Sequence, residues 1–447
     1  MSMRQRRAVV PRGIPAAVVL ALSLAGCGTQ VAGAPSGAGS GTASAAASAS
    51  ASASAVAPGV PAASLGFTRY PDSVEWPSVS DYVPPGEGLQ RLLTDGSCVL
   101  GIGTFQNGYR SVPVNWASGP GCTRLTLSPT PGSGDPAAGG DGPPAATGGW
   151  NGGGVYGQAV VRWTDGSLIA VNGEVDRVYP NGRDRRLADL GLPVPANPNS
   201  ESEDQGEVST AIRVGNRLLI GGGEMLSEVY HPLLWTSDDV GATVHRVPLP
   251  MPSGRAADTG VGALAADGAT VVAVAAGASN AYSNVPQGQL ATWSSTDAGA
   301  HWTVHTVDGL PAGSTITGVV RLADGWLAYG SIVHYGDPDR PLVLTSTDGS
   351  SWKRSDGPAM GPGDLVAATV DAAGRAVLVG HQTIPATRAD TSPSYCGAVW
   401  VGDGSAADWR RGALGCGAEP PAAVTTLSDG RVLIAGNRDL WLGRPKR

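Results

Sequence analysis

Tyrosine, histidine, arginine and carboxylate side chains recur in the segments that separate pairs of apolar runs along this chain. Amphipathic tyrosine combined with arginine and acidic groups suits the recognition of sugars or peptides. The candidate ligand-binding residues are Glu228, Tyr282, His334, Tyr335, Asp339, Arg340, His381, Arg388 and Tyr395. The same segments also hold Glu224, Tyr230 and His231. Because exposed connections are polar in any protein, the pattern predicts a binding face without naming its ligand.

A second set of acidic residues belongs to a recurring Ser-x-Asp pattern followed by glycine, and these carboxylates are the first candidates for catalysis. The three complete copies are Ser237 to Gly241, Ser295 to Gly299 and Ser346 to Gly349, and a degenerate copy runs from Asp403 to Trp409. Each copy follows an apolar, strand-like run. The serine and aspartate can accept bonds from nearby backbone N–H groups, and glycine supplies a positive φ. The pattern therefore predicts hairpin turns, which we call the Ser-x-Asp turns, and gives their acids a structural role.

The Ser-x-Asp turns resemble the Asp-box, or bacterial neuraminidase repeat, of sialidase-like β-propellers. The resemblance covers the chain from Gly206 to Trp409 and concerns the fold. In that family the boxes lie on the face opposite the active site. Catalysis there also requires an arginine triad, a Tyr–Glu nucleophile pair and an Asp acid/base. Phe67-Thr68-Arg69-Tyr70-Pro71 is a distant match to the first arginine motif, and the other catalytic residues have no recognisable match.

Metal and cofactor chemistry finds no support in the spacing of the ligand-type residues. Of the six histidines, only His301 and His305 are four residues apart, and they flank the end of a Ser-x-Asp turn where a strand is expected. The chain has no Cys-x-x-Cys pair. Gly221-Gly222-Gly223 lacks the following Lys-Ser/Thr and helix start of a phosphate loop. We therefore predict neither a metal site nor a cofactor.

Composition indicates an all-β protein that does not bind nucleic acid. The chain has 447 residues with 66 Gly, 35 Pro and 15% charged residues, and no long segment has apolar residues at helical spacing. Short strands separated by turn residues fit this composition. The net charge of −7 speaks against a nucleic-acid partner, because phosphate binding requires a basic surface.

Turns between two apolar runs recur with a period near fifty residues. They lie at Asp95, Asp165, Gly215, Asp267, Asp324, Ala373 and Asp429, with separations of 70, 50, 52, 57, 49 and 56 residues. The low-complexity insert 129–154 accounts for the long first interval. Such a period with about four strands per unit is typical of propeller blades. Seven turns predict a seven-bladed β-propeller, with six or eight blades as alternatives.

The last unit, from Ala422 to Gly443, has room for only three strands. We expect a segment near Phe67–Trp76 to supply the fourth and close the ring, which removes exposed edges. Because propeller strands alternate in direction, connections between second and third strands should lie opposite the Ser-x-Asp turns. Residues expected to converge there around the channel mouth are Tyr282, His334, Tyr335, Arg340, His381 and Arg388.

The N-terminus has the features of an export signal. Four arginines within the first twelve residues precede an apolar stretch from Ile14 to Gly26, which is too short to span a bilayer. Leu24-Ala25-Gly26-Cys27 resembles the lipobox of bacterial lipoproteins, in which this cysteine is acylated. An ordinary signal peptide is the alternative, and twin-arginine export is left open. We predict a signal peptide at 1–26, a flexible Ala/Ser/Gly-rich tether at 27–63 and a propeller domain at 64–447.

Five cysteines are present, and Cys27 is assigned to the lipid. The four that remain indicate two disulfides in an exported protein. Three pairings are possible. We favour Cys98 with Cys122 and Cys396 with Cys416, because each pair lies within one predicted blade.

Together these features predict a lipoprotein at the outer face of the bacterial cytoplasmic membrane, held there by its lipid anchor. Its propeller is expected to serve as a binding or scaffolding module for a glycan or protein ligand. The alternative is a sialidase-like or other glycoside hydrolase, which would require paired carboxylates near the pore. An assembly factor that docks on a membrane complex is a third possibility.

Overall fold

The computed structural model describes residues 59–76, 88–107, 110–128, 159–180, 183–193, 205–226, 229–252, 259–278, 287–333, 338–384, 394–416 and 421–446. The chain divides into two compact units, Met1–Ala57 and Pro58–Arg447, and the description concerns the second. The predicted signal peptide, Cys27 and the insert 129–154 lie outside the described residues. Within the described ranges, no helix has the length and apolar character needed to cross a membrane.

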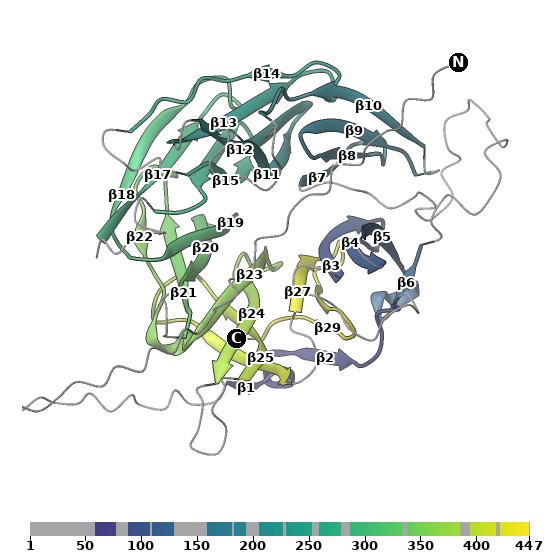
Figure 1. Cartoon of the computed structure of the whole chain (residues 1–447). Coiled ribbons are helices and arrows are strands. Elements are labelled where there is room, and N and C mark those ends of the chain that lie inside the picture. Colours follow the sequence, from purple (N-terminus) through teal and green to yellow (C-terminus); the bar gives the residue numbers. More distant parts are fainter. Residues whose placement is uncertain are drawn as a thin grey trace, which may run out of the picture. The chain divides into compact units, whose positions relative to one another are not determined.

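The fold is a β-propeller of seven antiparallel sheets, as predicted (Figure 1). Blade 1 holds β3 (Gly88–Asp95), β4 (Cys98–Asn107), β5 (Arg110–Ser118) and β6 (Leu125–Leu127). Blade 2 holds β7 (Ala159–Arg162), β8 (Leu168–Val171), β9 (Glu174–Val178) and β10 (Asp184–Asp189). Blade 3 holds β11 (Gln205–Val214), β12 (Arg217–Leu226), β13 (Val229–Ser237) and β14 (His245–Arg246). Blade 4 holds β15 (Val261–Asp267), β16 (Thr270–Ala275), β17 (Gln287–Ser295) and β18 (Thr303–Pro311).

The remaining blades include strands from the start of the described chain. Blade 5 holds β19 (Ser314–Leu322), β20 (Gly325–Ile332), β21 (Arg340–Ser346) and β22 (Lys353–Arg354). Blade 6 holds β23 (Gly363–Val370), β24 (Ala376–Ile384), β25 (Ser394–Gly402) and β26 (Arg410–Cys416), with β1 (Val60–Pro61) parallel to β26. Blade 7 holds β27 (Pro421–Thr426), β28 (Val432–Gly436), β29 (Leu440–Gly443) and β2 (Phe67–Tyr70). Three short 3₁₀ helices occur at Ala62–Leu65, Pro120–Cys122 and Pro358–Met360.

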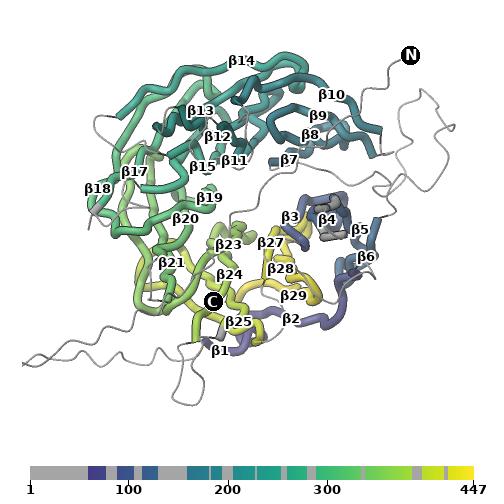
Figure 2. Tube along the Cα trace, in the orientation of Figure 1, coloured from purple at the N-terminus to yellow at the C-terminus, as the bar shows by residue number. Residues whose placement is uncertain are grey.

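The core lies between adjacent blades, since each sheet buries apolar residues on both of its faces. First strands contact one another around the ring from β7 through β11, β15, β19, β23 and β27 to β3 (Figure 2). Blades 1 and 2 complete the ring through a cluster that includes Leu100, Ile102 and Leu168. Arg162 also pairs with Asp95 at 2.5 Å across the same boundary.

The N-terminal strand closes the ring, as predicted. Residues of β2 pair antiparallel with β29, from Phe67 opposite Gly443 to Tyr70 opposite Leu440. The tether was expected to run to Ala63, but Val60 and Pro61 already pair with β26 and Ala62 is buried. These residues therefore belong to the propeller.

The seven predicted turns join the first and second strands of the seven blades. Glycines at these turns are Gly96, Gly166, Gly215, Gly268, Gly325, Gly374 and Gly430, and each has a positive φ. Side chains with a Cβ rarely adopt that conformation, so glycine marks the turn in every repeat. This local requirement explains why the sequence period reports the blade count.

The Ser-x-Asp turns join third and fourth strands in blades 3, 4 and 5, and the degenerate copy does so in blade 6. In blade 4 the Ser295 hydroxyl accepts a bond from the Gly299 N–H at 2.9 Å. The Asp297 carboxylate accepts the His301 N–H at 2.9 Å and the Ser295 hydroxyl at 2.8 Å. The hydrogen bonds predicted from the pattern are therefore present.

Third strands share two further features that the sequence analysis did not recognise. Tryptophan stands two residues before the end of β5, β13, β17 and β25, at Trp116, Trp235, Trp293 and Trp400. Three of these indoles donate to carbonyls of the segment that precedes the blade: Trp116 to Glu75, Trp293 to Pro250 and Trp400 to Met360. The indole N–H thus holds the chain as it passes from one blade to the next.

Proline stands five residues before the end of β5, β13 and β21, at Pro113, Pro232 and Pro341. The fourth strands of these blades are short, whereas those of blades 4 and 6, with Leu290 and Gly397 at this position, run further. Proline lacks the N–H that a longer fourth strand would bond, so it is tolerated where pairing has stopped.

Both favoured disulfides are present. Cys98 bonds Cys122 within blade 1, and Cys396 bonds Cys416 between β25 and β26. The two cysteines are 24 residues apart in the first bridge and 20 residues apart in the second.

Candidate functional site

The connections between second and third strands lie on the face opposite the Ser-x-Asp turns, as alternating strand direction requires. We call the first face the connection face and the second the turn face. Five of the nine predicted site residues lie outside the described residues: Glu228, Tyr282, His334, Tyr335 and Arg388. The other four lie at strand ends rather than in free loops. Arg340 begins β21, Asp339 precedes it, and His381 and Tyr395 belong to β24 and β25.

Asp339 and His381 come together at the boundary between blades 5 and 6. The Asp339 carbonyl accepts the Gly363 N–H at 2.6 Å, which ties the start of β21 to the start of β23. The next residue, Asp364, contacts His381, with 2.8 Å between its Oδ1 and the ring Nδ1. The same oxygen accepts the His381 N–H at 3.1 Å. These contacts link Asp339 to His381 through the consecutive residues Gly363 and Asp364.

Tyr395 lies on the same side of blade 6 as His381. It pairs with Thr383, while His381 pairs with Gly397 and Asp364. Directly opposed residues in antiparallel strands project to one side, and residues two apart share that side. Tyr395 is 60% exposed, so its ring is available for contact at the rim of this face.

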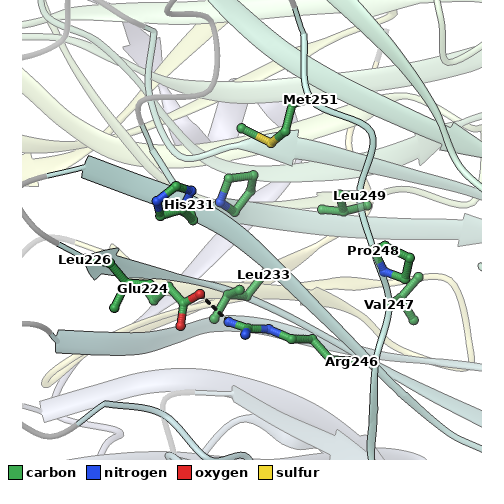
Figure 3. Close-up of a pocket in the computed structure, with 10 residues that line it drawn as sticks. Glu224, Leu226, His231, Leu233, Arg246, Val247, Pro248, Leu249 and Met251 are labelled. Atoms are coloured by element: carbon green, nitrogen blue, oxygen red, sulfur yellow. Dashed lines mark ion pairs between the residues drawn. The ribbon is translucent and has the colours of Figure 1, made fainter.

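A pocket of about 370 Å³ (Figure 3) lies at the outer strands of blade 3, beside the end of β12 and the start of β13 at the connection face. It is lined by Glu224 and Leu226 of β12, His231, Pro232 and Leu233 of β13, Arg246 of β14, and Val247, Pro248, Leu249 and Met251. Sequence reasoning assigned Glu224 and His231 to a loop, but they form a directly opposed pair in the β12–β13 ladder.

The pocket opens where the fourth strand ends. The Val247 N–H still bonds the Leu234 carbonyl at 2.8 Å. Two residues earlier in β13, Pro232 has no N–H to extend this ladder. The following segment contains Pro248, Pro250 and Pro252, whose fixed φ limits its backbone freedom, and Pro248 lines the pocket.

An ion pair forms the polar part of the pocket. The Arg246 guanidinium faces the Glu224 carboxylate and pairs with its Oε1 (Figure 3). The Glu224 side chain is 11% exposed and the Arg246 side chain is 52% exposed. The acid is therefore held inside the blade, whereas the base lies at its surface.

Exposed apolar side chains also gather on the connection face. Among the described residues, the large hydrophobic side chains classed as exposed are Val60, Val229, Met251, Val333, Ile384 and Tyr395. All except Val60 lie at ends of second or third strands or, for Met251, in the pocket wall. Exposed apolar side chains that gather on one face indicate a contact surface, whereas single ones scattered over the whole surface do not.

Two charged residues of the innermost strands were missed by the sequence analysis. Glu207 of β11 is accessible to solvent yet largely surrounded by protein, and this desolvation raises its pKa. Burial lowers the pKa of Arg91 in β3, and burial raises the pKa of Tyr329 in β20 to about 12. Arg91 and Glu207 each lie next to a β-bulge in β3 and β11. Both strands contain several other polar residues, so the sequence carries no signal that singles out these two.

The distant match to a catalytic arginine is wrong in position. Arg69 belongs to β2, the outermost strand of blade 7. Its guanidinium pairs with buried Asp439 at 2.5 Å, and Asp439 also accepts the Asp72 N–H. Arg69 therefore fastens the closing strand and does not face the channel.

The aspartates of the Ser-x-Asp turns have low pKa values because local donors stabilise their ionised form. The Thr243 hydroxyl and N–H lower the pKa of Asp239 to about 2. The His301 N–H lowers the pKa of Asp297, and the Ser351 N–H lowers that of Asp348. These bonds account for the acids as parts of the turns. No group of three or more metal-ligating side chains occurs in the part of the chain that the structure describes.

Fold and site together define a disulfide-linked, seven-bladed β-propeller with one polar and apolar face opposite its tight turns. No family model matches the chain, and no curated protein matches it. Solved structures with similar folds include a GH74 enzyme of Niastella koreensis, at 11% identity and a TM-score of 0.46, covering 80% of this chain and 52% of that one. YCF48 from Cyanidioschyzon merolae has 11% identity and a TM-score of 0.45, covering 85% and 98%.

A third similar structure is the extracellular domain of the putative one component system BT4673 from B. thetaiotaomicron. It has 8% identity and a TM-score of 0.44, and the match covers 86% of this chain but only 40% of that one. Values this low transfer neither ligand nor activity to this protein.

Proposed function

We propose that this protein is an exported binding module whose propeller holds a glycan or protein ligand against its connection face. The observation that carries the proposal is the one-sided distribution of exposed Val229, Met251, Val333, Ile384 and Tyr395. Apolar and aromatic side chains on an open rim supply the contact area that recognition requires. The His381–Asp364 pair adds polar groups on the same face.

Site-specific photo-crosslinking tests the proposal in the cells that produce the protein. A photoreactive phenylalanine analogue is placed at Tyr395 or Val333 on the connection face, and at exposed His245 on the turn face as the matched control. We expect discrete adducts from the first two positions and none from the third. A parallel glycan array with the full chain tests for a sugar ligand. Equal crosslinking at all three positions, without an array signal, would contradict the proposal.

Variants then measure the contribution of the rim. Ile384→Ser with Tyr395→Ala removes two exposed side chains without touching the core. Truncating the best contacts of an interface costs about 2 kcal/mol or more, so affinity for the identified ligand should fall roughly thirtyfold or further. Thr243→Ala with His245→Ala, on the turn face, should leave affinity unchanged.

Membrane anchoring through Cys27 is part of the proposal and rests on the lipobox-like Leu24-Ala25-Gly26-Cys27. Two disulfides support export, because such bonds persist in oxidising compartments. Cys27→Ala should move the protein from the membrane fraction to the soluble fraction, with its unfolding midpoint unchanged. Retention of the variant in the membrane fraction would count against the anchor.

A glycoside hydrolase is the second candidate, and one observation favours it. Glu207 lies on an innermost strand with a raised pKa, which is a property of general acids in hydrolases. The test is release of nitrophenol from aryl glycosides, including a sialoside, by the parent protein and by Glu207→Gln. Hydrolysis lost in the variant would support the enzyme. Absence of hydrolysis in the parent would remove this candidate.

A further inference from the structure

The blade 3 pocket contains an ion pair between a largely buried acid, Glu224, and a half-exposed base, Arg246. Glu224 sits within β12, paired to Gly206 on one side and to His231 on the other. Arg246 ends the two-residue strand β14, and its side chain extends along the surface. We propose that this pocket binds an organic cation with an apolar body and an ammonium or guanidinium end.

The buried Glu224 carboxylate determines which ligand charge the pocket prefers. A cationic ligand can take the place of Arg246 beside Glu224, because the half-exposed arginine can be hydrated in solvent while the ligand keeps the acid paired. An anionic ligand at Arg246 would meet the nearby Glu224 carboxylate, which has no comparable route to solvent. A buried acid left without a cation is costly, so the pocket favours a cationic occupant over a neutral one.

The remaining walls suit a hydrocarbon body. Leu226, Leu233, Val247, Leu249 and Met251 contribute apolar side chains to the lining, and His231 adds one polar ring. The volume of about 370 Å³ lies within the range of small-ligand sites. Pro232 and Pro248 restrict the backbone on both sides of the opening. The backbone therefore loses little conformational freedom when a ligand binds.

This inference rests on the proposed binding function and adds the chemistry of one contact. A small amine and the lysine side chain of a protein partner share the required features. A short peptide with one central lysine that displaces bound hexylammonium would assign the pocket to protein partners. A peptide that fails to displace it would assign the pocket to small amines.

Calorimetric titration of the full chain with hexylammonium, hexanol and hexanoate tests the charge preference. We expect hexylammonium to bind at least about tenfold more tightly than the two matched compounds. Glu224→Gln keeps the shape and removes the charge, and it should abolish this preference. Arg246→Gln removes the competing cation and should strengthen hexylammonium binding.

The opposite pattern would overturn the inference: hexanoate preferred, or hexylammonium weakened by Arg246→Gln and untouched by Glu224→Gln. Thermal unfolding of each variant checks the fold. If Glu224→Gln does not fold, Met251→Ala at the exposed rim replaces it and should weaken hexylammonium and hexanol alike. Equal binding by parent and Met251→Ala would contradict the pocket. Crosslinks on the connection face without hexylammonium binding would retain the proposed function and refute this site.

Discussion

At the residue scale, the carboxylates of the Ser-x-Asp turns have a structural role, because their hydrogen bonds are made within the turns themselves. Asp239 accepts the Thr243 N–H and hydroxyl at 2.8 and 2.7 Å, and Asp348 accepts two consecutive backbone N–H groups at 2.8 Å. Each carboxylate thereby stabilises a turn that glycine alone would leave underspecified. The cost of losing such an acceptor falls on the fold and not on a ligand.

These lowered pKa values make stability depend on acid. An unfolded aspartate titrates near pH 3.9, whereas Asp239 in the fold has a pKa of about 2. The ionised turn therefore contributes its full stability above about pH 4 and loses it as the pH falls towards about 2. Asp348 adds to this loss, because its pKa is lowered in the same direction.

Urea unfolding at a series of pH values measures this effect. We expect the free energy of unfolding to fall as the pH decreases through this window. Asp239→Asn and Asp348→Asn should each reduce the slope, since the asparagine does not titrate. A pH-independent unfolding free energy between about pH 4 and 2 would show that the turns do not hold ionised acids.

At the element scale, the length of the fourth strand distinguishes the blades. Blade 6 extends β26 to Cys416 and fastens it by a disulfide, whereas Pro232 ends pairing early in blade 3 and leaves a pocket. The same repeat thus produces a reinforced edge in one blade and a binding-sized opening in another. One residue in the third strand marks the difference.

Removing the blade 6 disulfide tests how much this reinforcement contributes. Cys396→Ser with Cys416→Ser opens a loop of 20 residues, and the free energy of unfolding should fall by about 2–4 kcal/mol. Denaturant unfolding measures the change, with reduction of the parent as a comparison. The parent should show no free thiol from Cys98, Cys122, Cys396 or Cys416 when denatured without reductant. Reactive thiols at these positions would refute the bridges in solution.

At the scale of the whole molecule, the ring is held shut by strands distant in sequence. β2 completes blade 7, and the Arg69–Asp439 pair joins residues 370 positions apart. Leu65 and Phe67 bury their side chains almost completely in this closure. Without them β29 becomes an open edge, which favours aggregation.

Truncation tests the closure. A chain that starts at Pro71 lacks β1, β2, Leu65 and Phe67, and it should lose at least about 3 kcal/mol because burying each large side chain contributes about 1.5–3 kcal/mol. A chain that starts at Gly59 keeps every described strand and serves as the control. Denaturant unfolding and light scattering measure stability and aggregation. Equal stability of the two chains would show that the ring does not depend on its N-terminal strand.

The sequence by itself determined the features that depend on a few neighbouring residues. Gly215 and Gly430 mark first-to-second strand turns because positive φ is a local demand, and their spacing therefore counts the blades. Ser295 and Asp297 bond donors within four residues, so their pattern predicts its own geometry. The nearby cysteine pairs follow the same logic.

Only the tertiary structure decided which side chains meet. His381 contacts Asp364 across paired strands, and Arg69 meets Asp439 across the ring closure rather than facing the channel. The blade 3 pocket exists because Glu224 and Arg246 come from strands separated by β13, and because Met251 lies in the chain that leaves the blade. The distances between these side chains are set by the register of strand pairing and by the positions at which the strands end. Register and strand ends depend on contacts between distant segments, which a repeat period or a short motif does not encode.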